Sequence, residues 1–239
     1  APLNLQQDVT FLPFNDEKLL EVEIKKGDVC AVIFEAIQGV GGLDEPSEGF
    51  IYAMDRLCKN YNVCLIADEV QSGFSRSGTF FAYQKCSIEP SIITMAKGMG
   101  NGFPVGGILA HSSIESKYGM LGTTFGGNHL ACSASLAVLD VIKKEGLQEH
   151  AKELGNYFTD FAKKISSVKK VKGRGLMLGL EFDFPVGPLR KELIYNQHIF
   201  TGGSSNKNLL RILPPLTIQK KHFDFFFQKL EEALKAINV

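Results

Sequence analysis

An apolar run in this sequence ends in a lysine and passes directly into a glycine-rich loop. This stretch limits the possible folds of the chain more than any other. The run begins at Ile92, the lysine is Lys97, and glycines follow at positions 98, 100 and 102. In open α/β sheets, ligands bind at the carboxyl ends of the strands, and glycines let the backbone turn sharply and approach a ligand closely. An amine removed from water loses its charge more easily and can attack a carbonyl group. We therefore expect a buried strand, a ligand site and a nucleophilic Lys97; the simpler alternative is a strand-end lysine in water.

A second apolar run ends in an acid, Asp68, which lies 29 residues before Lys97. A crossover between two parallel strands needs about a dozen or more residues, so this spacing suits neighbouring strands of one sheet. Asp68 and Lys97 would then lie at the same sheet edge. A buried carboxylate is costly unless a cation pairs with it, so the pattern predicts a cationic group beside Asp68. The next residue, Glu69, alternates away and is interpreted as a structural polar contact, with a role in the catalytic site as the alternative.

Four motifs in a fixed order contain or flank these two residues. They occupy residues 35–39 (EAIQG), 67–78 (ADEVQSGFSRSG), 96–98 (AKG) and 122–128 (GTTFGGN). Over about residues 29 to 218 the sequence resembles the class III aminotransferases, which are pyridoxal-phosphate (PLP) enzymes, and within them the acetylornithine and ornithine aminotransferases. The resemblance implies an α/β protein with the PLP-dependent transferase fold. Residues 1–137 would belong to the large domain with its mostly parallel sheet, and residues 138–239 would form a smaller α+β C-terminal domain.

The resemblance also implies roles for the residues at the predicted sheet edge. Lys97 would attach the cofactor covalently and then move a proton as general base and acid. Asp68 would pair with the protonated pyridine nitrogen, so that the ring can accept electrons. Val70 would pack on the ring face, and Gln71 would hydrogen-bond near the ring hydroxyl. Without the resemblance, Val70 would be read as an ordinary core valine.

Two threonines in the fourth motif are further candidates. In the family, the residue that matches Thr124 reaches the cofactor phosphate of the neighbouring subunit, and the residue that matches Thr123 lies near the substrate. A homodimer with shared active sites is therefore implied by the resemblance and by no feature of the composition. For either hydroxyl the alternative is a local loop or helix-cap contact.

A substrate-binding arginine is implied by the segment LLRILPP at residues 209–215. Arg211 matches the family arginine that binds a substrate carboxylate, for which the planar guanidinium is well suited. Many relatives carry a glutamate directly after the motif Gln-Gly, and that glutamate neutralises the arginine in one half-reaction. Here the position is Val40, which cannot pair with Arg211, and Ala36 replaces the proline that usually follows the first glutamate of the motif.

The expected activity follows from this departure. Because Arg211 should stay available in both half-reactions, we expect transfer of the terminal amino group of an N-acylated ornithine to 2-oxoglutarate, as in arginine biosynthesis. Free ornithine or another ω-amino acid is the alternative donor within the family.

Composition excludes several other classes of protein. The 26 basic residues are balanced by 26 acidic residues, which gives no basic footprint for nucleic acid and no polybasic membrane patch. No apolar run approaches the ~18 residues that a membrane span needs. Five cysteines without a C-x-x-C pair indicate reduced thiols in a cytoplasmic protein. The five histidines show no metal-ligand spacing, so no metal is assigned.

The beginning of the chain carries a separate expectation. Ala1 is not an initiating methionine, and family members have a further segment upstream that holds a phosphate-binding turn and an aromatic residue that stacks on the cofactor. We therefore expect a C-terminal part of the enzyme, which would be inactive without that segment or a complementary chain.

Other classes of function remain as alternatives. Thr94 and Lys97 loosely match the Ser-x-x-Lys pattern of lysine-assisted hydrolases, but no accompanying motif is present. The glycine loop lacks the spacing of a dinucleotide site, and its Lys-Gly order is the reverse of a P-loop. A catalytically inactive remnant that serves as an interaction surface is a third alternative. The hydrolase and nucleotide alternatives both predict no PLP binding.

Periodicity predicts the order of the elements. Apolar stripes along the helices are assigned to the core. Strands are expected at residues 29–34, 62–68, 92–96, 106–110, 176–182, 199–201 and 209–213, and helices at 16–23, from 46–47 to about 61, 80–83, 130–144, 147–165 and 219–237.

Overall fold

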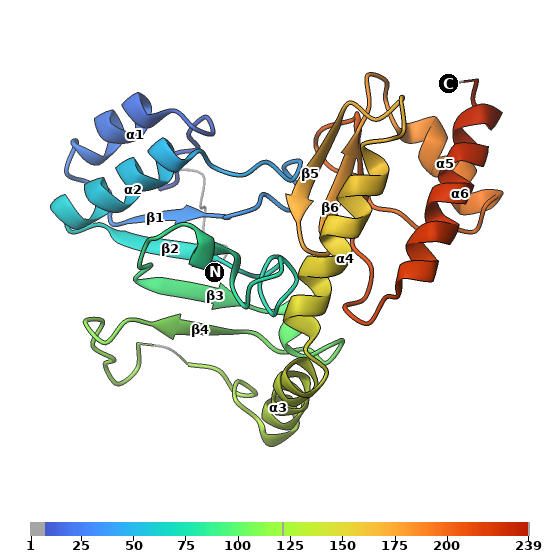
Figure 1. Cartoon of the computed structure of the whole chain (residues 1–239). Coiled ribbons are helices and arrows are strands. Elements are labelled where there is room, and N and C mark those ends of the chain that lie inside the picture. The colour runs from blue at the N-terminus through green and yellow to red at the C-terminus, as the bar shows by residue number, and fades with distance from the viewer. Residues whose placement is uncertain (1–7, 121, 239) are drawn as a thin grey trace.

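The computed structural model describes residues 8–120 and 122–238, which form two β-sheets (Figure 1). The first sheet has the order β1-β2-β3-β4, with strands β1 (Ala31–Phe34), β2 (Cys64–Asp68), β3 (Ile92–Met95) and β4 (Gly107–Ala110). β1, β2 and β3 run parallel, and β4 pairs antiparallel with β3. The carboxyl ends of the three parallel strands therefore lie at one edge of the sheet.

Two helices, α1 (Glu17–Ile24) and α2 (Glu48–Asn60), pack together on one face of this sheet (Figure 1). Each begins at a side-chain cap that satisfies an otherwise unpaired backbone N–H: Asp16 Oδ1 accepts from Leu19 N at 2.9 Å, and Ser47 Oγ accepts from Phe50 N at 3.2 Å. The buried side chains of both helices join those of the strands in one apolar core. This packing leaves Ile33 of β1 61% exposed.

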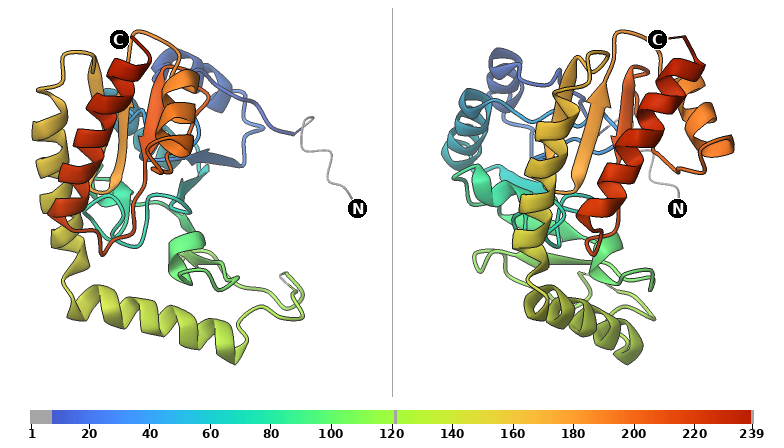
Figure 2. Two further views of the ribbon diagram at one scale, coloured as in Figure 1. Left: turned by 90° about the vertical axis from the view of Figure 1, so that its right-hand side faces the viewer. Right: turned by 45° about the vertical axis from the view of Figure 1, so that its right-hand side comes forward.

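The second sheet is antiparallel and has the order β5-β6-β7. Helix α3 (His129–Lys144) leads from the first sheet to α4 (Leu147–Ala162), which packs beside α6 on the second sheet (Figure 2). Phe158 of α4 lies at the centre of this core, with its ring centroid 5.0 Å from that of Phe223 and 4.8 Å from that of Phe227. The remaining elements are β5 (Lys170–Arg174), β6 (Met177–Glu181), α5 (Gly187–Tyr195), β7 (Leu209–Ile212), α6 (Lys220–Ala236) and the short 3₁₀ turns η1 (Ala82–Lys85) and η2 (Lys97–Met99).

The loop that follows β2 joins the two sheets through a buried arginine. Arg76 Nη1 donates to the carbonyl oxygens of Leu176, at 3.3 Å, and Pro214, and the Arg76 carbonyl accepts from Leu176 N at 2.9 Å. Burial lowers the pKa of the Arg76 guanidinium to about 10. Two ion pairs make a second connection, from Lys172 to Asp44 at 2.8 Å and from Arg174 to Glu45 at 2.7 Å. The loops that follow β1 and β2 are thus held against the second sheet.

The backbones at this junction are so close that Gly155 of α4 has no room for a side chain. A Cβ atom there would lie 2.2 Å from the carbonyl oxygen of Gly175. We predict that Gly155→Ala lowers the free energy of unfolding by about 1–3 kcal/mol, the usual cost of overpacking, despite the ~1 kcal/mol that alanine gains in a helix. Urea unfolding checks this. Gly187→Ala is the matched control, because a Cβ there meets nothing within 4 Å, and equal stability of the two variants would contradict the prediction.

Most of the predicted elements are confirmed, with three errors. Residues 199–201 do not form a strand, and the neighbouring Gly202 makes only an isolated bridge to Arg211. Strand β5 and helix α5 were not predicted. The domain boundary after residue 137 stays a prediction.

The assignment of all apolar helix stripes to the core is wrong for α3. Leu130 is 71% exposed, Val141 is also exposed, and only Ala131, Ser135 and Ile142 of this helix are buried. Figure 2 shows much of α3 lying away from both sheets, and its contacts are with α4 and η2. The periodicity correctly predicted a helix, and Ile142 joins a small core with Phe74 and Leu147. Leu130, Leu136, Leu139 and Val141 stay exposed, because no described part of the chain covers them. In α2, Tyr61, at the C-cap, is also exposed rather than packed.

Candidate active site

Asp68 and Lys97 lie at the same edge of the first sheet, as the spacing predicted. Asp68 is the last residue of β2 and pairs in register with Thr94 of β3, the strand that leads to Lys97. On the other side of β2, Phe34 pairs with Ala67. Glu35, the residue after Phe34, is therefore next in register to Asp68. Side chains in register on parallel strands share a face, so Glu35, Asp68 and Thr94 form a row across three strand ends.

The Asp68 carboxylate is half-buried and has one oxygen committed to the protein. Its Oδ1 accepts from Thr94 Oγ1 at 3.2 Å and from Val70 N at 3.0 Å. Within the described residues, Oδ2 has no hydrogen-bond donor. This arrangement fixes the carboxylate and leaves one oxygen for a cationic group. Thr94, the hydroxyl of the hydrolase alternative, is engaged by Asp68.

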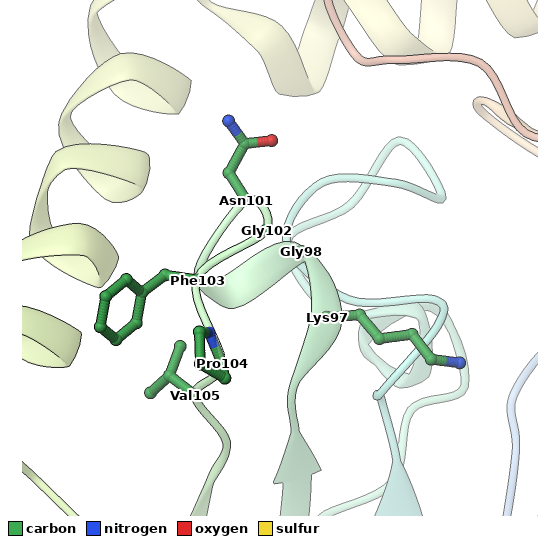
Figure 3. Close-up of a pocket in the computed structure, with 7 residues that line it drawn as sticks. All are labelled: Lys97, Gly98, Asn101, Gly102, Phe103, Pro104 and Val105. Carbon is green, nitrogen blue, oxygen red and sulfur yellow. The ribbon is translucent and has the colours of Figure 1, made fainter.

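Lys97 begins the short turn η2 and has a left-handed backbone conformation, with φ +45°. For a residue other than glycine this conformation costs free energy and occurs often at functional sites. The lysine was expected to be desolvated, but it is exposed, because no described residue covers the amine. Figure 3 shows its side chain extending away from the glycine loop, with which Lys97 lines a shallow pocket. The loop residues in that lining are Gly98, Asn101, Gly102, Phe103, Pro104 and Val105.

Arg211 of β7 reaches the loops that follow β1 and β2. Its Nη1 donates to the Gly39 carbonyl at 2.9 Å and lies 3.5 Å from Gln71 Oε1, while its Nε donates to the Gly203 carbonyl at 2.5 Å. Burial lowers the pKa of the Arg211 guanidinium, and the positive charge of Arg190 lowers it further. The fold thus places Gln71 and Arg211, which are 140 residues apart, within contact of each other.

The Gln71 side chain explains why residue 39 is a glycine. A Cβ atom on residue 39 would lie 2.2 Å from Gln71 Nε2, so any larger residue would displace that amide. Gly39 N donates to Glu35 Oε2. Glu35 received no role from the sequence, although it ends its strand just as Asp68 does, and this was the signal that could have identified it.

Glu69 is a structural residue, as interpreted from the sequence. It is 1% exposed and accepts hydrogen bonds from Ser72 Oγ, Ala82 N and Tyr83 N at 2.7–2.9 Å. Burial raises the pKa of this carboxyl group, against the effect of the three hydrogen bonds. Its carboxylate holds the turn that follows β2 and contacts Ser72, Ala82 and Tyr83, away from the row of Glu35, Asp68 and Thr94.

The two candidate threonines lie apart from this cluster within one chain. Both are exposed, and Thr123 Oγ1 accepts from Gly126 N at 3.1 Å inside its own loop. In the described part of the chain, neither hydroxyl hydrogen-bonds to Asp68, Gln71, Lys97 or Arg211. Val70 follows Asp68 directly and is half-buried.

Among residues 8–120 and 122–238, no helix is both long and apolar enough to cross a membrane. The same residues contain no group of three or more histidine, cysteine, aspartate or glutamate side chains that could hold a metal ion.

Comparison with known proteins identifies the family to which the chain belongs. Residues 5–234 match the model of the family described as aminotransferase class-III. The acetylornithine aminotransferase of Aquifex aeolicus is 44% identical over 91% of this chain and 56% of its own length, and the ornithine aminotransferase of Oceanobacillus iheyensis is 38% identical over 92% and 56%. A structure of the Toxoplasma gondii ornithine aminotransferase, described as having PLP in partial occupancy at its active site, superposes with a TM-score of 0.87 at 29% identity, over 96% of this chain and 56% of that one.

The chain thus spans little more than half the length of these relatives. The family match covers nearly all of it, and the fold is that of the PLP-dependent aminotransferases. Asp68 ends β2, and Lys97 follows the adjacent strand β3. The chain therefore belongs to the class-III aminotransferase family.

Proposed function

We propose that this chain is the part of a PLP-dependent aminotransferase that carries the cofactor lysine, and that the enzyme transfers the terminal amino group of an N-acylated ornithine to 2-oxoglutarate. The observation that carries the proposal is the convergence of Asp68, Lys97 and Arg211 at one sheet edge. The charges of all three act on the same carboxyl group, that of Glu35. A reaction of this kind would serve arginine biosynthesis in the cytoplasm.

The residues present fit PLP in two respects. Asp68 Oδ2 has no donor among the described residues and would accept the protonated ring nitrogen. Lys97 presents an exposed amine to an aldehyde. When bound, PLP supplies a ring that accepts electrons from the substrate. Val70 would contact the ring face, Gln71 would lie near the ring hydroxyl, and Thr124 would reach the phosphate bound by a second subunit.

Each protein group would then have one task. Lys97 Nζ would hold the cofactor and would move a proton from and to the substrate carbon that bears the amino group. Thr94 and Val70 keep the Asp68 carboxylate in a fixed orientation through their hydrogen bonds to Oδ1. Arg211 binds the carboxylate of 2-oxoglutarate, and of a donor that presents a carboxylate or a polar acyl group there.

The preference for an acylated donor rests on residue 40. Arg211 donates to the carbonyl oxygen of Gly39, and the residue that follows Gly39 is the exposed, uncharged Val40. A substrate screen with the protein expressed from its intact gene tests the proposal, with glutamate and 2-oxoglutarate as one pair. N-acetylornithine and N-succinylornithine should be better donors than free ornithine. Higher kcat/KM with free ornithine would overturn this assignment of the donor, and absence of PLP would favour the hydrolase or nucleotide alternative.

We predict that Arg211→Ala weakens the half-reaction with 2-oxoglutarate by roughly 1.5–3 kcal/mol, the usual value of a hydrogen bond to a charged group. Single-turnover kinetics of each half-reaction measure this effect. Arg56→Ala is the matched control, because Arg56 is an exposed arginine on α2. Unchanged rates in both half-reactions of Arg211→Ala would show that this arginine does not bind substrate.

A homodimer is part of the proposal. Its support is helix α3, on which the apolar side chains of Leu130, Leu136 and Leu139 are exposed, since large exposed apolar patches mark interaction surfaces. The loop that carries Thr123 and Thr124 directly precedes this helix. The partners of the chain would be a second subunit and an N-terminal segment or complementary chain that completes the phosphate site. Without that part, the chain is proposed to be inactive.

A further inference from the structure

Glu35 lies between the candidate cofactor residue Asp68 and the candidate substrate-binding residue Arg211, and it has no role in the proposed reaction. It follows β1, and its half-buried side chain lies in the row with Asp68 and Thr94. Its Oε2 accepts the N–H of Gly39, and the carbonyl oxygen of Gly39 accepts Arg211 Nη1 at 2.9 Å. Glu35 therefore acts on Arg211 through a single residue.

Gly39 is held from two further sides. The Gln71 amide lies where a side chain of residue 39 would be, and Ser205 N donates to the carbonyl of the next residue, Val40, at 2.8 Å. Without the bond to Glu35, no described side chain would accept the Gly39 N–H. The Gly39 carbonyl would then lose its fixed direction, and Arg211 would lose one of its three acceptors.

The charged groups around Arg211 also indicate a role for Glu35. No acidic side chain of the described residues lies within 4.0 Å of the Arg211 nitrogens to form an ion pair. The acidic group whose charge acts on Arg211 is Glu35, and the effect is opposed by Arg190. Because Glu35 is hydrogen-bonded to Gly39, it lies near Arg211 without occupying the guanidinium. Nη2 of Arg211 makes no hydrogen bond to a described residue and is the nitrogen left for a substrate carboxylate.

We propose that Glu35 is a positioning residue that fixes Gly39, so that the Gly39 carbonyl holds Arg211 ready to bind the carboxylate of the substrate. This inference rests on the proposed function, because it takes Arg211 as the substrate-binding arginine. What positions Arg211 is the hydrogen bond that Glu35 accepts, and not its charge. Substitutions that keep the acceptor should therefore keep binding, and substitutions that remove it should weaken binding whether or not they keep the charge.

The experiment compares three substitutions in the PLP-loaded protein expressed from its intact gene. Glu35→Gln keeps an oxygen acceptor at the same reach, Glu35→Asp keeps the charge but is one methylene too short, and Glu35→Ala removes both. The probe is glutarate, a five-carbon dicarboxylate without a reactive keto group, and its dissociation constant is measured by titration calorimetry. Glu153→Ala, at an exposed position of α4, is the matched control.

We expect Glu35→Ala and Glu35→Asp to raise the Kd for glutarate by about tenfold, the effect of about one hydrogen bond. Glu35→Gln and Glu153→Ala should stay within about twofold of the parent protein, which is the scatter of neutral surface changes. In steady-state kinetics, the KM for 2-oxoglutarate should rise in Glu35→Ala and Glu35→Asp, while kcat changes little.

Each other outcome overturns the inference. Unchanged glutarate binding by Glu35→Asp, or equal losses in Glu35→Gln and Glu35→Ala, would show that the hydrogen bond does not position Arg211. If Glu35→Ala does not fold, the comparison of the glutarate Kd between Glu35→Asp and Glu35→Gln decides whether the hydrogen bond positions Arg211. Failure of the proposed function is a separate result, because it would appear as absence of transamination in the parent protein whatever the variants bind.

Discussion

Replacing Lys97 by alanine is expected to abolish transamination while leaving the fold intact. The side chain is exposed and ends in an amine that contacts no acidic group of the described residues, so its removal leaves no buried group without a partner. The reaction would lose both its covalent attachment point and its general base. We expect kcat to fall by at least about 10³-fold, within the range that a positioned acid–base group supplies.

Two measurements accompany this prediction. Thermal unfolding should show a midpoint close to that of the parent protein. Lys221→Ala removes an exposed lysine from α6 and should retain full activity. A Lys97→Ala variant that keeps more than about a tenth of the parent kcat would show that another residue carries the base, since general acid–base groups contribute far more than that.

Replacing Asp68 by asparagine is expected to have the second largest effect. Asparagine has the same shape, and its carbonyl oxygen can accept the two hydrogen bonds from Thr94 Oγ1 and Val70 N. The substitution therefore removes the negative charge and little else. We expect kcat to fall by about 10²–10³-fold, the usual loss when one preorganised electrostatic group is removed.

The matched control for this substitution is Asp160→Asn at an exposed position of α4. Surface substitutions of this kind change stability little, so activity and stability should be unchanged. Absorbance spectroscopy of the bound cofactor supplies a second readout, since loss of the carboxylate alters the protonation of the ring nitrogen. Unaltered kcat and spectra in Asp68→Asn would contradict the assignment.

Local signals explain why the positions of Asp68 and Lys97 could be predicted. Each follows a short run of β-branched and apolar residues, and the 29 residues between them fit one crossover. The helices α1 and α2 begin where Asp16 and Ser47 cap them, and such caps are recognisable in a sequence. Glu35 likewise follows a short apolar strand, β1, and lies next in register to Asp68.

The elements that were missed have weak local signals. Helix α5 buries only Leu189 and Leu193, too few for a clear periodicity. Strand β5 has the sequence KVKGR and exists because every residue pairs with β6, which is a long-range property. Residues 199–201 are β-favouring, yet Phe200 is 85% exposed and the segment has no partner strand.

The hydrogen bonds that join Arg211 to the loops after β1 and β2 depend on long-range contacts, which the spacing of residues in the sequence does not predict. Arg211 lies 172 residues from Gly39 in sequence, and the bond between them exists because Arg76, Lys172 and Arg174 hold the two sheets together. The exposed side of α3 is a different case. A pattern of apolar residues predicts a face that avoids water, but it does not tell whether the same chain or a partner covers that face.

Borohydride reduction of the PLP-loaded protein, expressed from its intact gene, tests directly whether Lys97 attaches the cofactor. Reduction converts the carbon–nitrogen double bond between a lysine amine and the cofactor aldehyde into a stable single bond, so that peptide mass spectrometry can find the labelled lysine. We expect the reduced cofactor on the peptide that contains Lys97, and on no other. Label on a different lysine, or none at all in protein that has bound PLP, would contradict it.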